Sequence, residues 1–283
     1  MKEIIVTIDV EDWFQCESMR GKFPIDTWGS QQYRVERNVE RILCLLEEKG
    51  ASATFFCLAN IAEKFPSLIS SIHESGHEIA SHGYNHVMLN QLSDDEITED
   101  LYKSKNILEN IICSHVDGYR APTFSIASHV YPILKKLGYK YDSSLNLFQG
   151  HDRYGSVNPL EFENLENGIL MHNSGIREFT IPTISKFGAS IPWGGGGYFR
   201  LLPYFVYKKG VQSYLNYNDF FMFYLHPWEL DPDQPKISDI SLSNKFRHYN
   251  NLARTYEKFS SLLNDFKGVS ISNYDRNTPS NIT

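Results

Sequence analysis

The chain has 283 residues, of which 41% are hydrophobic and 14% aromatic. This composition excludes intrinsic disorder for most of the chain, and the length fits one or two ordinary domains or a single α/β barrel. The 27 Lys and Arg residues against 34 Asp and Glu residues give a net charge of −7, so we expect no nucleic-acid partner and no general attraction to anionic lipid.

The four cysteines are scattered, and none forms a Cys-x-x-Cys pair. Their spacing argues against a thiolate zinc site or a redox dithiol. Only a few apolar residues precede Asp9, which is too short for the apolar region of a signal peptide. No uncharged apolar stretch approaches the ~20 residues that a transmembrane helix needs. We therefore expect a cytoplasmic protein without stable membrane insertion, of unknown oligomeric state.

Strand and helix signals alternate along the first half of the chain. Short apolar runs predict strands at residues 4–8, 53–57, 76–80, 118–120 and 139–142. Helical periodicity predicts helices near residues 35–46, 61–71 with an interruption at Pro66, 93–112 and 130–137. Alternation of this kind is typical of parallel strands joined by crossover helices.

The second half of the chain is less regular. Residues 145–217 are rich in Gly, Asn and Pro and contain the run Gly194 to Gly197, so we expect short elements or an inserted lid there. Order returns with a strand, a long helix and a last strand, at residues 220–225, 244–263 and 268–271. We expect a single catalytic domain over residues 1–272 and a flexible tail over residues 273–283.

Chemically active side chains lie at or just after the ends of several predicted strands. They are Asp9, His82, Arg120, Asp142 and His226. The carboxyl ends of parallel barrel strands are where active sites are built. A histidine there can protonate a leaving group near neutral pH, and an arginine can orient a catalytic carboxylate. Asp142 could in turn hold Arg120 or His226 in position.

Two patterns indicate a metal site. His82 and His86 have the i, i+4 spacing that places both imidazoles on one side of a helical turn, and Asp9, Glu11 and Asp12 form an acidic cluster. Three carboxylates so close repel one another unless something positive neutralises them. One could bind a metal while another acts as general base. Residue spacing alone leaves open whether Glu11 or Asp12 is the ligand.

Taken together, the motifs resemble those of the NodB-homology polysaccharide deacetylases, carbohydrate esterase family 4. The similar segments appear in the family's order, at residues 7–12, 82–86, 120–122, 142 and 225–226. Residues 8–14, 118–122 and 196–200 are also similar to a subgroup found with bacterial exopolysaccharide and surface-glycan loci. Two departures stand out. The first motif reads Asp-Val-Glu-Asp instead of adjacent aspartates, and Gly83 replaces the usual Ser or Thr.

The resemblance implies a fold and a reaction. The fold is an α/β protein, a distorted (β/α)7 barrel of the NodB or TIM-like type. The reaction is the metal-dependent removal of an N-acetyl group from an N-acetylated sugar or surface glycan, the hydrolysis of a linear amide C–N bond. Exopolysaccharide or O-antigen biosynthesis is the expected context.

The resemblance also assigns roles to residues. It implies one divalent ion, Zn²⁺ by ligand type, bound by Asp12, His82 and His86, with Glu11 as the alternative carboxylate. Asp9 is then the general base and His226 the general acid. Arg120 holds Asp9, and Asp142 holds Arg120.

Several side chains are candidates for contact with the sugar. Aromatic rings can stack on sugar rings, and Arg200 follows the glycine run, where the backbone can approach a ligand closely. The candidates are Trp13, Pro122, Trp193, Tyr198, Arg200 and Trp228. Two alternatives to the deacetylase remain open at this point. One is an allantoinase-like or other small-molecule amide hydrolase on the same scaffold, and the other is a catalytically inactive glycan-binding module.

Overall fold

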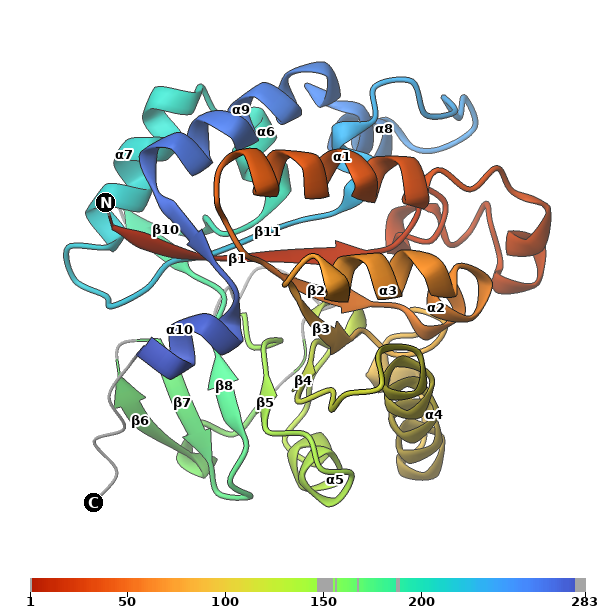
Figure 1. The fold of residues 1–283 in the computed structure, drawn as a ribbon, viewed down its shortest axis with the longest axis vertical. Coiled ribbons are helices and arrows are strands. Elements are labelled where there is room, and N and C mark those ends of the chain that lie inside the picture. Colours follow the sequence, from red (N-terminus) through yellow and green to blue (C-terminus); the bar gives the residue numbers. More distant parts are fainter. Residues whose placement is uncertain (1, 147–154, 156, 167, 187–188, 278–283) are drawn as a thin grey trace.

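A sheet of parallel strands forms the centre of the molecule (Figure 1). The structure, a computed structural model, describes residues 2–146, 155, 157–166, 168–186 and 189–277. The parallel strands are β1 (Glu3–Val10), β2 (Thr54–Cys57), β3 (Glu78–Ser81), β4 (Gly118–Tyr119), β5 (Tyr141–Asp142), β8 (Arg177–Phe179), β11 (Met222–Leu225) and β12 (Lys267–Val269). Their order is β11-β1-β2-β3-β4-β5-β8, and β12 also pairs with β1.

Helices cover the outside of this sheet (Figure 1). They are α1 (Val35–Glu48), α2 (Ala59–Lys64), α3 (Pro66–Glu74), α4 (Asp94–Ile112), α5 (Val130–Lys136), α6 (Gly196–Leu201), α7 (Tyr204–Tyr214), α8 (Leu242–Tyr249), α9 (Leu252–Asp265) and α10 (Ile271–Asn277). The 3₁₀ turns are η1 (Glu17–Met19), η2 (Ile25–Ser30), η3 (Leu89–Gln91), η4 (Pro122–Phe124), η5 (Pro159–Glu161) and η6 (Pro227–Leu230).

Local sequence explains several of these boundaries. Ser93 and Glu96 form a reciprocal capping box that starts α4, which satisfies two backbone N–H groups that a helix start leaves free. Pro66 separates α2 from α3 and occupies the first turn of α3, where its missing N–H costs nothing. The alternation of strands and helices predicted for the first half of the chain is confirmed.

The strand register brings the polar strand ends together. Ser81, the last residue of β3, pairs with Tyr119 of β4, and Tyr119 pairs with Asp142 of β5. On the other side, Ile8 of β1 pairs with Leu225 of β11. The residues that follow these pairs therefore emerge at one edge of the sheet, although they come from distant parts of the chain.

Two predictions for the second half are wrong in detail. Residues 244–263 form two helices, α8 and α9, because Asn251 adopts a left-handed backbone with a φ of 55° between them. Residues 271–277 form α10, so the expected tail is helical at its start, and residues 278–283 lie outside the described part.

Most of the expected insertion is continuous with the main fold. Strand β8 pairs with β5 in parallel, and the antiparallel strands β7 (Ile169–His172) and β6 (Phe162–Glu166) extend the same sheet. A separate hairpin joins β9 (Thr183–Lys186) to β10 (Ala189–Pro192). The glycine run leads into α6, which contacts β11 and α9.

None of the helices in the described part of the chain combines the length and the apolar character needed to cross a membrane.

An aromatic cluster between β11 and its covering helices is central to the core. Phe223 is fully buried, and its ring lies 4.9 Å from that of Phe199 and 5.5 Å from that of Phe259. We expect Phe223→Ala to lower the free energy of unfolding by about 3–5 kcal/mol, because it removes a large buried side chain and leaves a cavity. Urea unfolding measures this loss.

Phe205, whose side chain is 65% exposed, supplies the matched control. Phe205→Ala should stay within about 0.5 kcal/mol of the wild type. Equal losses in the two variants would show that Phe223 is not a core residue.

Candidate functional site

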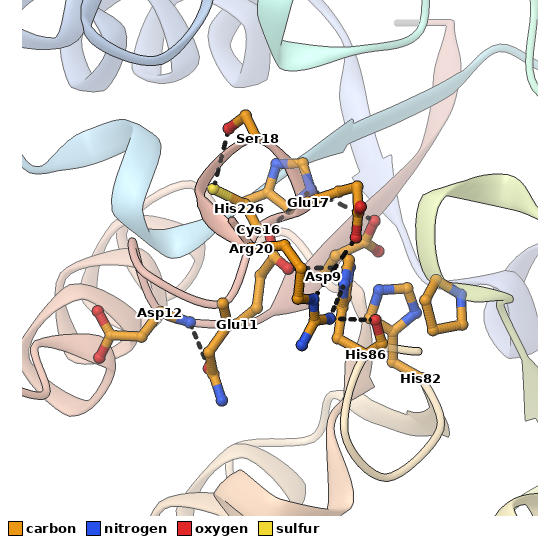
Figure 2. Close-up of polar contacts among 12 residues, drawn as sticks. Asp9, Glu11, Asp12, Cys16, Glu17, Ser18, Arg20, His82, His86 and His226 are labelled. Atoms are coloured by element: carbon orange, nitrogen blue, oxygen red, sulfur yellow. Dashed lines mark hydrogen bonds and ion pairs between the residues drawn. The ribbon is translucent and has the colours of Figure 1, made fainter. Parts of the chain in front are cut away.

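A cavity of about 180 Å³ opens at the carboxyl ends of the strands. The residues predicted from the sequence that line it are Asp9, Glu11, His82, His86, His226 and Trp228. Asp9 lies in β1, and the others follow β1, β3 and β11, so the register described above brings them together. Figure 2 shows Asp9, Glu11, His82, His86 and His226 gathered in this way. Carboxylates, imidazoles and the indole ring of Trp228 thus surround one small cavity.

Arg120 is buried inside the barrel and holds Asp9. One Nη1 hydrogen bond goes to Asp9 Oδ1 at 2.7 Å and another to Thr7 Oγ1 at 2.9 Å. The other guanidinium nitrogens donate to the Ser143 carbonyl at 2.9 Å and to Ser143 Oγ at 2.8 Å. The guanidinium also lies 4.1 Å from the centre of the Phe56 ring. It therefore has a fixed position and a fixed hydrogen-bonding pattern.

This contact helps to keep Asp9 charged. Burial raises the pKa of the Asp9 carboxyl, but Arg120, His82 and His226 together outweigh burial, so the pKa lies below its ordinary value. Asp9 is consequently a carboxylate at neutral pH, as a general base must be.

Glu11 faces the two histidines. Its Oε2 lies 3.0 Å from His86 Nε2 and forms no hydrogen bond in the described part of the chain, although it is buried. The His82 and His86 rings are 5.3 Å apart. His82 Nδ1 donates to the Arg120 carbonyl at 2.8 Å, and this bond leaves its Nε2 with a free lone pair.

The histidines do not share a helical turn, contrary to the sequence expectation. Residues 82–88 have no helix, and His86 has a φ of 53°. The rings are brought together by the loop after β3 instead. Gly83 has a φ of 75°, and a Cβ there would meet the Asp100 carboxylate at 2.9 Å, which explains a glycine where the resemblance predicts Ser or Thr.

Burial controls the protonation of these three side chains. It raises the pKa of Glu11 to about 7, lowers that of His82 to about 4 and lowers that of His86 well below its ordinary value. Both imidazoles are therefore neutral at pH 7. Neutral imidazoles and a carboxylate are metal-ligand types, yet in the described residues no three His, Cys, Asp or Glu side chains already stand in a metal-holding arrangement.

His226 completes the cavity with Nε2 toward the acids. This atom lies 3.5 Å from Glu11 Oε1 and 3.8 Å from Asp9 Oδ2, and Nδ1 lies 2.8 Å from Glu229 Oε1. Burial lowers the pKa of His226, but Glu11, Glu229 and Asp9 outweigh it and raise the pKa to about 9. His226 is therefore protonated at neutral pH and has a proton to give.

The structure does not bring Asp12 to the histidines, which corrects the predicted ligand set. Asp12 Oδ1 accepts from the Trp13 N–H, and Oδ2 accepts from the N–H groups of Arg34 and Val35 at 2.6 and 3.0 Å. Figure 2 shows Asp12 directed away from His82 and His86, on the far side of Glu11. The carboxylate is used to hold the start of α1, and Glu11 takes the place beside the histidines.

Asp142 also differs from its predicted role, because no described hydrogen bond joins it to Arg120 or His226. Its oxygens accept from the Ser144 N–H and Oγ at 2.9 and 2.7 Å. The adjacent residue, Ser143, makes the contacts to Arg120. Burial and the nearby Glu178 carboxylate raise the pKa of Asp142 well above its ordinary value.

Of the predicted sugar-binding residues, Trp228 lines the cavity in the described part of the chain. The others do not, namely Trp13, Pro122, Trp193, Tyr198 and Arg200. Trp13 is buried and donates to the Gln32 carbonyl, and Trp193 stacks on Tyr207. Arg200 is buried and pairs with Glu229. That a residue is aromatic therefore did not show whether its side chain lies in the core or at the cavity.

Sequence reasoning missed several cavity residues: Cys16, Glu17, Ala121, Thr123, Phe124 and Tyr224. Thr123 is distinctive. It is β-branched, yet its φ is 55°, and its Oγ1 is buried without a hydrogen-bond partner in the described structure. Such backbone strain gathers at functional sites. Thr123 directly follows the motif Arg120-Ala121-Pro122, and this position could have identified it as a cavity residue from the sequence.

Comparison with known families agrees with this geometry. The protein is a parallel α/β barrel with carboxylates and imidazoles gathered at its strand ends. Residues 26–141 match the family model described as polysaccharide deacetylase, and residues 143–275 match one described as a domain of unknown function, DUF3473. Residues 26–141 thus match the polysaccharide deacetylase family, which confirms the family predicted from the motifs. The exopolysaccharide-locus subgroup stays a prediction.

Two proteins of similar sequence are named as peptidoglycan deacetylases or as similar to them. A peptidoglycan deacetylase of Helicobacter pylori is 29% identical over 51% of this chain and 50% of its own length. A peptidoglycan deacetylase-like protein of Gibberella zeae is 34% identical over 40% of this chain and 33% of its own. The matched region thus spans a third to a half of these relatives.

The fold match extends over nearly the whole chain. It covers 99% of this chain and 93% of a Mycobacterium smegmatis protein described as a polysaccharide deacetylase, with a TM-score of 0.56 and 20% identity. This likeness confirms the predicted α/β barrel fold.

The Asp142 and Glu178 pair makes stability depend on pH. A raised carboxyl pKa means that the folded state binds a proton which the unfolded state has lost above pH ~4. Stability therefore falls as pH rises from about 4 through the raised pKa. We expect Asp142→Asn, which has no proton to lose, to show a smaller fall in the free energy of unfolding between pH 5 and pH 8. Urea unfolding at both values measures it, and identical falls in variant and wild type would contradict the assignment.

Proposed function

We propose that the protein is a metal-dependent N-deacetylase that removes the acetyl group from an N-acetylated sugar of a glycan. The observation that carries the proposal is the grouping of an ionised Asp9, the Glu11–His86 contact and a protonated His226 around one cavity. A base and an acid that line one small cavity suit the hydrolysis of an amide. The relatives named peptidoglycan and chitooligosaccharide deacetylases support the choice of glycan.

The donor set fits a divalent metal. Glu11 Oε2 is buried 3.0 Å from His86 Nε2 and has no hydrogen bond in the described structure. Two ligand-type atoms thus face each other, and this carboxylate oxygen is left without a donor. We assign Glu11, His82 and His86 as the residues that would hold the ion. Two imidazoles and a carboxylate are a known zinc set. Such an ion, when bound, would polarise the acetamide carbonyl as a Lewis acid.

The chain's own residues carry the proton transfers. Asp9, kept ionised by Arg120, takes a proton from the attacking water. His226 Nε2 gives a proton to the amine nitrogen as it leaves. In the loop after Arg120 the N–H groups of Ala121, Phe124 and Ser125 donate to other acceptors of the protein. We assign the Thr123 N–H, at the cavity, to the developing oxyanion.

Acetate release tests the proposal directly. The purified protein, supplied with Zn²⁺, should release acetate from N-acetylglucosamine oligomers or peptidoglycan, and Asp9→Asn should be slower by about 10²–10⁴-fold, the usual contribution of a general base. Binding of these glycans without acetate release would favour an inactive glycan-binding module. Hydrolysis of allantoin in place of the glycans would favour the small-molecule alternative.

Metal content separates the two candidate carboxylates. We expect Glu11→Gln to lose bound zinc, because it removes the charged oxygen that faces His86. Asp12→Asn should keep the zinc and lose about 0.5–2 kcal/mol of stability, since Asp12 caps backbone N–H groups at α1. Elemental analysis and urea unfolding measure the two effects. If Asp12→Asn loses the zinc and Glu11→Gln retains it, the ligand assignment is reversed.

A further inference from the structure

A buried carboxylate joins His226 to Arg200. Glu229 Oε1 lies 2.8 Å from His226 Nδ1 and accepts the His226 backbone N–H at 3.1 Å. Glu229 Oε2 accepts from Arg200 Nε at 2.6 Å. Each carboxylate oxygen thus has a fixed partner on a different side, so the orientation of the His226 ring depends on where Glu229 is held.

Arg200 is itself fixed by the backbone. The residue is 3% exposed, its Nη1 donates to the carbonyls of His248 and Asn250 at 3.0 and 2.8 Å, and its Nη2 donates to the Arg247 carbonyl at 2.6 Å. These acceptors lie at the end of α8. A planar guanidinium held at three nitrogens cannot rotate, so it offers Nε to Glu229 in one direction.

Gly196, in the glycine run, lets the start of α6 approach η6, the turn that carries Glu229. A Cβ on Gly196 would meet both Glu229 carboxylate oxygens at 2.3 Å, whereas a Cβ on Gly197 would meet nothing within 4 Å. The Glu229 carboxylate has little freedom to move aside, because both of its oxygens are hydrogen-bonded. Gly196 is therefore required by the position of this carboxylate, and Gly197 is not.

A stack of rings supports the same side of the cavity. The Trp228 ring stacks on His226 at 5.3 Å and on His248 at 4.3 Å, and its Nε1 donates to Glu11 Oε1 at 3.1 Å. The face of His226 is held by Trp228 and its Nδ1 edge by Glu229. The remaining edge, with Nε2, points to Asp9 and Glu11.

We propose that Arg200 and Gly196 are positioning residues for the deacetylation reaction, which hold Glu229 so that it orients His226 toward the substrate. The inference rests on the proposed function. It assigns a role to residues 143–275, which match a domain of unknown function: this half supplies the acid His226 together with the residues that orient it. Arg200 is not among the residues that line the cavity; it pairs with Glu229, and its guanidinium also lies 5.6 Å from the centre of the Trp228 ring.

The test measures kcat and KM for acetate release from N-acetylglucosamine oligomers in folded, zinc-loaded variants. Gly196→Ala and Arg200→Gln should lower kcat by about 10- to 100-fold, the usual loss when an outer-shell partner is removed, and leave KM within about twofold, because the cavity lining is intact. Arg200→Lys should recover part of kcat. Gly197→Ala is the matched control and should behave as wild type.

A second readout is independent of activity. In ¹⁵N-histidine-labelled protein, the downfield Nδ1–H proton of His226, assigned by its loss in His226→Gln, reports the bond to Glu229. We expect this signal to shift or vanish in Gly196→Ala and to stay in Gly197→Ala. If Arg200→Gln does not fold, Gly196→Ala and the isosteric Glu229→Gln replace it.

The outcomes separate this inference from the proposed function. Unchanged kcat and an unchanged His226 signal in folded Gly196→Ala and Arg200→Gln would show that Arg200 merely anchors α8, and would overturn the inference. If the wild type releases no acetate, the proposed function fails, and the His226 signal alone decides: its loss in Gly196→Ala supports the positioning role, and its persistence overturns it.

Discussion

The buried contact between Arg120 and Asp9 is the interaction on which the rest of the site depends. A guanidinium sealed inside a barrel is costly unless each of its donors is satisfied. Here Thr7 and Asp9 of β1 and Ser143, directly after β5, accept its hydrogen bonds. The same contact opposes the effect of burial and, together with His82 and His226, keeps the pKa of Asp9 below its ordinary value. The carbonyl of Arg120 also fixes the His82 ring. One residue therefore couples the assembly of the strand ends to the charge of the base.

The two halves of the chain build opposite sides of one cavity. The first half supplies Asp9, Glu11 and the paired histidines, and its pattern of strands and helices is regular. The second half supplies β11, whose register with β1 places His226 beside the acids. The irregular segment before β11 contributes Arg200 and Gly196, which do not line the cavity but lie against Glu229, the partner of His226.

The two corrected residues show how far a motif can be trusted. Asp12 and Asp142 occupy the motif positions that the resemblance assigns, yet their carboxylates have other partners. Asp12 accepts from backbone N–H groups at the start of α1. Asp142 accepts from the N–H and hydroxyl of Ser144, two residues away, a local hydrogen bond that short polar side chains readily make. Glu11 has one methylene more and no such donor beside its Oε2. Its side chain therefore reaches the place that a motif match would give to Asp12.

The sequence alone indicated the family and the parallel strands of the first half. It also grouped four residues in one site: Asp9, His82, His86 and His226. These features could be predicted because hydrophobic periodicity and the polar residues that end each strand are local signals. The direction of each side chain was decided only by the tertiary structure, since it depends on backbone torsion and on donors from distant segments. The tertiary structure likewise decided the helix break at Asn251, the loop conformation at His86 and the hydrogen-bond partners of Asp12. It also decided the position of Glu229. This residue follows His226 by three positions, but its carboxylate is held by Arg200 and lies close to Gly196.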